Sequence, residues 1–297
     1  MSSAVSVAPD DFEWGAPDGP ATVVEAVRRD CRAADGQDPL DEASALHLAH
    51  HGLAGARLWL STDAGRFAPG FALRRGTGVD LAVAPAARGR GLGRALAAVA
   101  LAGDDPVTAW SHGDHPAAAR LAAVHHLARA RELWVMRRPL AEPLAELVVP
   151  ADLEIRGYSP DDAAEVIRVN AAAFAAHPEQ RAMDAANLAE RMAQDWFDPA
   201  GLLVAVDILA GGRVLGFHWT KQHSAEVGEV YVVGIDPAAQ GRGLGKLLTL
   251  AGLHHLAGRG VGEVLLYVEA DNAPAVSVYR GLGFTHRDAD THVQYRR

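Results

Sequence analysis

The chain has 297 residues, of which 49% are hydrophobic, and its formal net charge at pH 7 is −9. A chain of this length and apolar content can bury one large core or two ordinary ones. The negative charge argues against a general nucleic-acid binder, which would present a basic surface. No apolar run reaches the roughly 18 residues of a membrane-spanning helix. Residues 1–9 lack the basic segment of a signal peptide, and one cysteine, Cys31, fits a reducing cytoplasm. We therefore expect a cytoplasmic protein.

The first half of the chain is predicted to alternate between helices and short strands. Apolar spacing and turn residues indicate helices over 22–34, 41–51, 94–101 and about 114–128. β-Branched and apolar runs indicate strands over 57–60, 70–74, 78–83, 107–110 and 133–137.

The second half repeats this order after a proline-containing stretch. Helices are expected over 160–176, 187–194, 241–258 and 273–282. Strands are expected over 153–156, 202–207, 214–220, 226–235, 263–269 and 292–296.

Residues 230–250 are predicted to form a strand, a glycine-rich loop and a helix, which together can bind a phosphate. Small residues let the backbone approach an anion, and the helix N-terminus adds N–H groups and its dipole. A P-loop is excluded because Lys246 is followed by Leu247 instead of a hydroxyl residue. The alternating glycines also differ from the G-x-G-x-x-G of dinucleotide-binding proteins. Arg242 and Lys246 would supply positive charge.

The loop Gln240–Gly245 resembles the acyl-CoA signature of the GCN5-related N-acetyltransferase (GNAT) family. The resemblance implies that the loop amides bind the pyrophosphate of acetyl-CoA and that the preceding strand holds the thioester. We expect Gly234 to lie at a β-bulge that frees a backbone amide for the thioester carbonyl. In this region the expected acetyl-CoA contacts are Val233, Gly234, Ile235, Gln240, Gly241, Arg242, Gly243, Leu244, Gly245 and Lys246.

The same loop occurs earlier in the chain. Aligning Pro85 with Pro237, an offset of 152 residues, superposes residues 89–93 on 241–245. A repeat of this kind indicates two copies of one domain. We expect an α/β (α+β) protein with tandem GNAT domains over 1–138 and 152–297, joined by a linker over 139–151. Each would have a mixed, mostly antiparallel twisted sheet flanked by helices. The expected CoA contacts of the first copy are Leu81, Ala82, Val83, Arg88, Gly89, Arg90, Gly91, Leu92 and Gly93.

Acetyl transfer to an amine needs a group that takes a proton from the amine and a group that protonates the leaving thiolate. Glu229 lies on the strand before the second loop, where a carboxylate would face the acceptor amine. The alternative for Glu229 is a solvent-facing strand residue.

Residues 271–284 resemble the second GNAT signature, which implies that the Tyr279 hydroxyl protonates the sulfur. The alternative for Tyr279 is a core residue of an amphipathic helix. Further acetyl-CoA contacts implied by this signature are Asn272, Ala273, Pro274, Ala275, Val276 and Ser277.

In the first copy, Thr77 aligns with Glu229 and Ala122 aligns with Tyr279. The first copy thus keeps the loop and lacks both proposed proton carriers. We expect a CoA-binding but catalytically silent N-terminal domain.

Residues 172–180, 196–201, 215–221 and 228–232 resemble a tandem actinobacterial branch of the GNAT family. This branch acetylates the cysteinyl amine of cysteinyl-glucosaminyl-inositol, the last step in the biosynthesis of a small amino-sugar thiol. Charged side chains suit an acceptor that is covered with hydroxyls. The acceptor contacts that the resemblance implies are Glu42, Glu179, Lys221, Glu229 and Tyr267.

Two other functions stay open. The acceptor could be an aminoglycoside or a peptide amine, since acidic clefts suit cationic aminoglycosides. The chain could also be a non-catalytic acetyl-CoA sensor, although Glu229 and Tyr279 argue against this. No metal is expected, because the adjacent histidines at 50–51, 125–126 and 254–255 point about 100° apart on a helix. We expect a monomer with no nucleic-acid or membrane partner.

Overall fold

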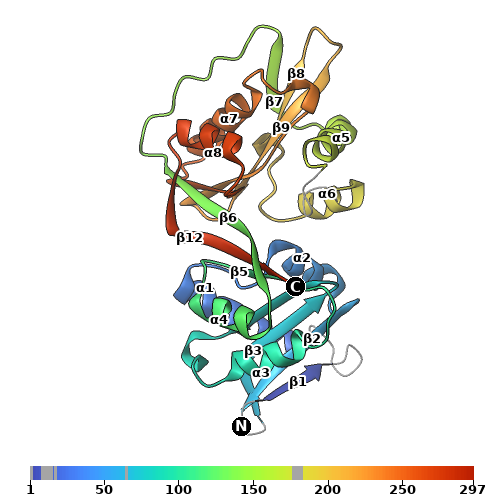
Figure 1. The fold of residues 1–297 in the computed structure, drawn as a ribbon. Coiled ribbons are helices and arrows are strands. Elements are labelled where there is room, and N and C mark those ends of the chain that lie inside the picture. Colours follow the sequence, from blue (N-terminus) through green and yellow to red (C-terminus); the bar gives the residue numbers. More distant parts are fainter. Residues whose placement is uncertain (1–2, 8–15, 17–18, 64–65, 176–182) are drawn as a thin grey trace. The chain divides into compact units, whose positions relative to one another are not determined.

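The computed structural model describes residues 3–7, 16, 19–63, 66–175 and 183–297, whose helices and strands are drawn in Figure 1. The chain divides into two compact units. The N-terminal unit contains the chain up to Leu133 together with Asp288–Arg297, and the C-terminal unit contains Trp134–Arg287. Each unit is described separately below.

In the N-terminal unit, helices cover both faces of a mixed sheet. The strands are β1 (Ser3–Val7), β2 (Ala56–Asp63), β3 (Arg66–Arg75), β4 (Gly78–Val83) and β5 (Thr108–Ser111), followed by parts of β12 (Thr285–Arg296) and β6 (Ala128–Pro139). Side chains of α1 (Pro20–Asp35) and α2 (Glu42–His51) pack on one face. Those of α3 (Leu92–Ala100) and α4 (Pro116–Val124) pack on the other.

The C-terminal unit repeats this arrangement. Its sheet contains β7 (Leu153–Gly157), β8 (Leu202–Asp207), β9 (Arg213–Gln222), β10 (Val227–Ile235) and β11 (Glu263–Glu269), followed by the other parts of β6 and β12. The helices α5 (Ala163–Ala173) and α6 (Ala185–Met192) pack on one face. The helices α7 (Leu244–Gly258) and α8 (Ala273–Gly281) pack on the other.

In each unit, two neighbouring parallel strands pair over a short stretch only. The strands β4 and β5 pair at Gly78–Thr108 and Val79–Ala109. The strands β10 and β11 pair from Val227–Glu263 to Val230–Leu266. The pairs β1–β2, β2–β3, β3–β4 and β5–β12 are antiparallel, and so are β7–β8, β8–β9 and β9–β10. Beyond these few residues, β4 separates from β5, and β10 separates from β11, as each strand continues toward its glycine-rich loop within the described residues. The predicted fold class is confirmed.

The long strands β6 and β12 differ from the strands expected at 133–137 and 292–296. They are longer because each contributes residues to both units. Residues Val293–Arg296 of β12 pair with β5, which places the end of the chain in the N-terminal unit. The expected domains at 1–138 and 152–297 do not include this return of the C-terminus.

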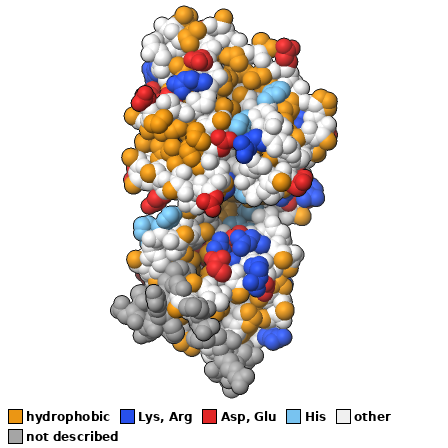
Figure 2. All heavy atoms as spheres, turned by 180° about the vertical axis from the view of Figure 1, so that it is seen from behind, with side chains coloured by type: hydrophobic (Ala, Val, Ile, Leu, Met, Phe, Trp, Pro, Cys, Tyr) orange, Lys and Arg blue, Asp and Glu red, His pale blue; other side chains and the backbone are white. Residues whose placement is uncertain are grey.

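Acidic and basic side chains are mixed on the surface. On the face in Figure 2, basic groups lie close to acidic ones in several places. Ion pairs such as Arg28–Asp38 and Arg129–Asp114 are examples of this mixing. Over the described ranges, no helix is both long and apolar enough to cross a membrane.

Candidate active site

The glycine-rich loop of the C-terminal unit connects β10 to α7. After Asp236, a short 3₁₀ turn (Pro237–Ala239) leads to Gly241 and Gly243, whose φ angles are +80° and +76°. This left-handed conformation favours glycine, and within the described chain nothing lies within 4 Å of a Cβ added at either position. Gly243 is the N-cap of α7, so free N–H groups of the first turn lie next to the loop. The geometry fits a bound pyrophosphate.

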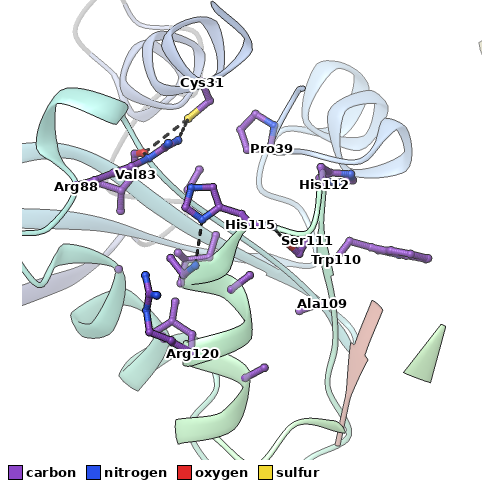
Figure 3. A pocket seen from close by; sticks show the side chains of 18 of the residues that line it. Cys31, Pro39, Val83, Arg88, Ala109, Trp110, Ser111, His112, His115 and Arg120 are labelled. Atoms are coloured by element: carbon purple, nitrogen blue, oxygen red, sulfur yellow. Dashed lines mark hydrogen bonds between the residues drawn. The ribbon is translucent and has the colours of Figure 1, made fainter. Parts of the chain in front are cut away.

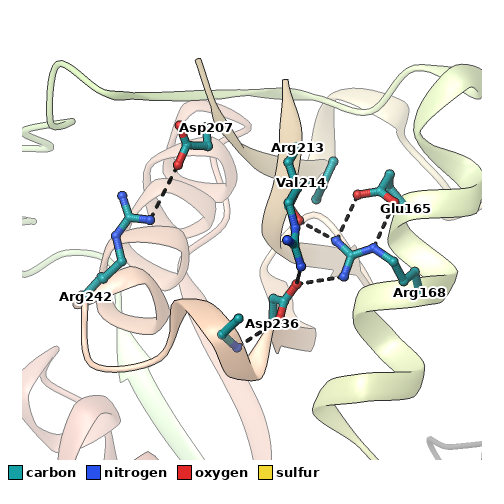
Figure 4. A network of polar contacts seen from close by, with 8 residues as sticks. Glu165, Arg168, Asp207, Arg213, Val214, Asp236 and Arg242 are labelled. Atoms are coloured by element: carbon teal, nitrogen blue, oxygen red, sulfur yellow. Dashed lines mark hydrogen bonds and ion pairs between the residues drawn. The ribbon is translucent and has the colours of Figure 1, made fainter. Parts of the chain in front are cut away.

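Asp236 fixes the turn that begins this loop (Figure 4). Its carboxylate accepts hydrogen bonds from Arg168 of α5 at 2.7 Å, from Arg213 of β9 at 2.8 Å and from the Ala238 amide at 2.9 Å. The hydrogen bond from Arg168 is the main reason why the pKa of Asp236 falls to about 2. Asp236 is a functional residue of the loop that the sequence pattern did not predict. Its position directly before Pro237 was the available signal.

The side chain of Arg242 does not match the predicted phosphate contact. Its guanidinium lies 2.8 Å from Asp152 and 3.6 Å from Asp207, so two carboxylates neutralise its charge. Lys246 lies exposed in the first turn of α7. The basic side chain best placed for an anion at the loop is therefore Lys246, while Arg242 connects the loop to β7 and β8.

Glu229 is buried on β10, with a relative exposure of 5%. Its neighbours Gly228 and Val230 face α7, so alternation along the strand directs Glu229 to the α5–α6 face. The carboxylate oxygen Oε2 lies 2.7 Å from Nε2 of His223. On the adjacent strand, Lys221 is the register partner of Glu229. The alternative of a solvent-facing strand glutamate is therefore wrong, and His223 is a neighbour that sequence reasoning missed.

The β-bulge lies at Tyr231 and not at Gly234. The pairing of β10 with β9 shifts between Val230 and Val232, which leaves Tyr231 as the extra residue. Gly234 is regularly paired with Phe217, and a Cβ at Gly234 would lie 2.6 Å from that ring. The glycine is required by this close approach, so the expected bulge at Gly234 is wrong.

Aromatic rings and cations line the α5–α6 face next to Glu229. Tyr231 packs against Trp196 and Trp219, with ring centroids 5.1 and 5.7 Å apart. The Lys221 ammonium lies 4.7 Å from the Trp196 ring centroid and 5.0 Å from that of Tyr231. The Tyr231 hydroxyl accepts a hydrogen bond from Arg191. Of these residues, only Lys221 was predicted as an acceptor contact.

Tyr279 lies on α8, on the opposite face of the sheet from Glu229. It packs against the core cluster that contains Val230 of β10, and its ring makes an edge contact with Phe284. Burial raises the pKa of Tyr279 to about 12. The hydroxyl therefore keeps its proton at physiological pH, which is the state that a general acid requires. Glu229 lies in the paired stretch of β10 and β11, one residue before the pairing ends at Val230–Leu266.

The other predicted contacts fall into three groups. In the first, the side chains serve the fold: Asn272 is the N-cap of α8 and accepts from the Ala275 amide, while Val276 is buried and Val233 packs against the same core. In the second, the residues are accessible: Tyr267 on β11 is 39% exposed, and Ala273, Pro274 and Ser277 lie exposed on α8. The third group comprises residues outside the described part of this unit: Glu42 begins α2 in the N-terminal unit, and Glu179 falls outside the described residues.

The N-terminal unit contains a cavity of about 350 Å³ at the corresponding place (Figure 3). It is lined by Leu81 and Val83 of β4, by Ser111 and His112 at the end of β5, and by the loop glycines 89, 91 and 93. Gly89 and Gly91 have φ angles of +79° and +84°, as in the other loop. The first copy thus retains the separated strands and the loop conformation.

Arg88 closes one side of this cavity. Its guanidinium donates to Asp35 at 2.8 Å and to Cys31 Sγ at 3.5 Å. Burial raises the pKa of the Cys31 thiol, which therefore stays protonated. Cys31 is therefore a buried, packed thiol.

The strand register shows that the residue of the first copy equivalent to Glu229 differs from the one that the sequence alignment predicted. On β3, Arg75 pairs with Gly78, and on β9 the equivalent Lys221 pairs with Glu229. The β3–β4 pairing has no register shift among the described residues, so the missing bulge moves the alignment by one residue. The counterpart of Glu229 is therefore Gly78 and not Thr77. The counterpart of Tyr279 is Ala122, which is buried on α4.

Comparison with known proteins places the chain among acetyltransferases. Residues 167–284 match the model of the Acetyltransferase (GNAT) family. The chain is 61% identical over 291 residues to the mycothiol acetyltransferase of a Nocardioides species, covering 92% of this chain and 96% of that protein. It is 53% identical over 281 residues to the mycothiol acetyltransferase of Nocardia farcinica, covering 91% and 92%.

Two solved structures share the fold over the whole chain. A GCN5-related N-acetyltransferase from Sphaerobacter thermophilus has a TM-score of 0.69 and 23% identity, with 100% of this chain and 95% of that chain covered. A tandem GNAT protein from the clavulanic acid biosynthesis pathway has a TM-score of 0.69 and 21% identity, with 100% and 98% covered. At these identities the likeness concerns the fold alone.

Proposed function

We propose a mechanism that proceeds from one premise: this chain belongs to the mycothiol acetyltransferases, within the GNAT family, and is an N-acetyltransferase. GNAT enzymes take the acetyl group from acetyl-CoA. The acceptor that we propose is the cysteinyl amine of cysteinyl-glucosaminyl-inositol, so that the reaction is the last step of mycothiol biosynthesis.

In the proposed reaction, Glu229 takes a proton from the ammonium form of the acceptor. The N–H bond breaks, an O–H bond forms on the carboxylate, and the amine lone pair attacks the thioester carbonyl. When the C–S bond breaks, the Tyr279 hydroxyl donates its proton to the leaving sulfur, and the second proton that the nitrogen loses on becoming an amide restores this hydroxyl. The observation that carries this proposal is the buried Glu229 on β10, one residue before the paired stretch with β11 ends at Val230–Leu266.

Backbone amides would supply the remaining interactions with acetyl-CoA. The loop at 241–245 presents left-handed glycines and the N-terminus of α7 to a pyrophosphate. The bulge at Tyr231 interrupts the regular ladder of β10 near the carbonyl position, where a freed amide would stabilise developing negative charge. No step requires a metal ion.

Aromatic and charged side chains support a sugar-like acceptor. Trp196 and Tyr231 offer ring faces for a pseudo-disaccharide, and Lys221 lies over both rings as a donor to its hydroxyls. Tyr267 is exposed on β11 on the same face of the sheet as Leu265, the strand partner of Glu229. Contacts from Glu42 and Glu179 stay predictions from the family resemblance.

The N-terminal unit is proposed to be catalytically silent. Gly78 and Ala122 occupy the positions of Glu229 and Tyr279, and neither side chain can carry a proton. Its loop and cavity would keep a binding role for CoA.

The test is an acetyl-CoA assay of the wild type and Glu229→Gln with three acceptors: cysteinyl-glucosaminyl-inositol, an aminoglycoside and a simple peptide amine. We expect the wild type to prefer the first acceptor, and Glu229→Gln to lose roughly 10²- to 10⁴-fold in kcat with similar CoA affinity. Unchanged turnover in Glu229→Gln would remove this residue from the mechanism. A preference for the aminoglycoside would replace the proposed acceptor.

A further inference from the structure

The turn between β9 and β10 brings an imidazole against the proposed general base. His223 Nε2 lies 2.7 Å from Glu229 Oε2. The backbone of His223 is fixed in the turn, since its amide donates to the Val227 carbonyl at 2.9 Å. Ser224 Oγ also accepts from the Val227 amide at 3.1 Å. The contact therefore lies at the end of the hairpin, where hydrogen bonds hold the backbone of His223.

The two partners differ in their access to solvent. The side chain of Glu229 is 7% exposed, whereas that of His223 is 38% exposed. A buried carboxylate needs a hydrogen-bond donor, because an ionised group without one is strongly disfavoured. When His223 Nε2–H donates to Oε2, the second carboxylate oxygen stays available for the acceptor. The Nδ1 atom is then the position at which His223 gains a proton.

Several of the surrounding charged groups have contacts of their own. On β9 the Lys221 ammonium lies over aromatic rings, and from α6 the Arg191 guanidinium lies against Tyr231. On β11 Glu263 is ion-paired with Arg137 of β6 at 2.7 Å. The other titratable groups on these elements include Glu226 in the turn, Tyr267 and Glu269 on β11, Glu190 on α6 and Arg213 on β9. The histidine of β9, His218, faces α7 on the other side of the sheet, and burial lowers its pKa to about 4. His223 is a histidine whose side chain contacts Glu229 directly.

We infer that His223 is a positioning residue for Glu229: it holds the carboxylate in the orientation that receives the acceptor proton, and it must be neutral for Glu229 to act as a base. An imidazolium 2.7 Å from the carboxylate would stabilise the ionised form and weaken its affinity for a proton. Activity should therefore fall when His223 becomes protonated. This inference depends on the proposed role of Glu229 and adds a second residue to it.

The test uses two substitutions with opposite chemistry, measured in the full-length enzyme with acetyl-CoA and cysteinyl-glucosaminyl-inositol. His223→Gln keeps an N–H donor near the position of Nε2 but cannot become charged. We expect its kcat to stay within about threefold of the wild type, and the acid limb of its kcat/KM profile to move to lower pH. His223→Leu removes the donor and should lower kcat by roughly tenfold or more, with little change in KM for acetyl-CoA.

His254→Gln is the matched control. His254 is a partly exposed histidine of the same unit, whose Nε2 bonds to the Ala145 carbonyl at 2.8 Å. It should leave both kcat and the pH profile unchanged. Thermal unfolding of all variants separates loss of function from loss of fold.

Three outcomes would overturn the inference. The first is an unchanged kcat in His223→Leu, and the second is an unmoved acid limb in His223→Gln. The third is an additive loss when His223→Leu is combined with Glu229→Gln, because a residue that acts through Glu229 has nothing left to position in that background. If Glu229→Gln alone keeps full turnover, the proposed function fails first. If Glu229→Gln loses activity and both His223 variants behave like the wild type, Glu229 stays the proposed base and His223 has no positioning role.

Discussion

The two units share a fold but differ at every position that the proposed chemistry needs. Both have parallel strands that separate, a loop with two left-handed glycines and a helix that begins after it. The C-terminal unit adds a bulge at Tyr231, the buried Glu229 with its histidine, and Tyr279. The first copy has an unshifted strand, Gly78 and Ala122 instead. The difference supports the proposal that the loop and the separated strands form a binding scaffold, to which a few side chains and one extra strand residue add the catalytic groups.

A large loss of turnover is expected when the C-terminal unit is made to resemble the N-terminal unit at α8. Tyr279→Phe removes the proposed acid proton and keeps the ring, as the first copy lacks the hydroxyl at Ala122. We expect kcat to fall by roughly 10²-fold with unchanged thermal stability, because the hydroxyl is proposed to act on the leaving sulfur only. Steady-state kinetics measures this. Tyr158→Phe, another partly buried tyrosine of the same unit, is the control, and equal activity of both variants would contradict the acid role.

Packing between sheet and helix offers a second test of the comparison. Two facing positions, one on the sheet and one on the helix that covers it, differ together between the units. The C-terminal unit has His218 on β9 and Gly252 on α7, and the first copy has Ala72 on β3 and Ala100 on α3 at the same positions. A Cβ on Gly252 would lie 2.1 Å from the His218 ring. Gly252→Ala should therefore lower the free energy of unfolding by about 1–3 kcal/mol.

Gly258→Ala in the same helix is the matched control, since the described structure has nothing within 4 Å of its Cβ. It should be neutral or stabilising by up to about 1 kcal/mol. The double variant His218→Ala/Gly252→Ala should recover part of the lost free energy of unfolding, because two alanines fit at these positions, as Ala72 and Ala100 do in the first copy. Denaturant unfolding measures all three, and equal stability of the Gly252 and Gly258 variants would refute the packing argument.

The turn before each loop differs in its charge. Asp236 binds Arg168 and Arg213, whereas the equivalent Ala84 is a small buried residue. Because the folded pKa of about 2 lies below the ordinary 3.8, this carboxylate contributes stability above pH 3.8 and loses it as the pH falls toward 2. Asp236→Asn should lower the free energy of unfolding by about 1–2 kcal/mol at pH 7. The difference in this free energy between the variant and the wild type should become smaller in acid.

Urea unfolding at neutral and acidic pH measures this loss. Asp152→Asn removes a half-exposed partner of Arg242 and should cost less than about 1 kcal/mol. A gap for Asp236→Asn that stays constant down to pH 2 would show that the ion pairs do not stabilise the turn.

The last substitution lies in the N-terminal unit and is expected to increase the free energy of unfolding instead of lowering it. Burial, with the nearby Asp41 charge, raises the pKa of Asp80 to about 7, and Ser44 donates a hydrogen bond to it at 2.7 Å. The stability that this group contributes is therefore full below pH 3.8 and is lost as the pH rises toward 7. Asp80→Asn should raise the free energy of unfolding at pH 8 by about 1 kcal/mol without changing turnover.

Thermal unfolding at pH 5 and pH 8 tests this, with Asp105→Asn at an exposed site as the control. A lower melting temperature for Asp80→Asn at pH 8 would mean that the ionised carboxylate is stabilised by its surroundings. A loss of turnover would contradict the silence of the first copy.

The sequence by itself determined the local features. The left-handed glycines, the helix starts and the strand-loop-helix order depend on neighbouring residues, so Gly241, Gly243 and their copies at 89 and 91 could be recognised from spacing. The repeat, the GNAT fold and the family followed from the same stretches. The residues Glu229 and Tyr279 were located because they lie within these recognisable segments.

Only the tertiary structure decided which distant groups meet. The pairing of Arg242 with Asp152, the return of β12 to the N-terminal unit and the contact of His223 with Glu229 depend on strand register and burial. The bulge at Tyr231 moved the counterpart of Glu229 by one residue, because an extra residue in one strand is visible only against its partner. Local backbone preferences can be read along the chain, whereas side-chain partners are selected by packing across it.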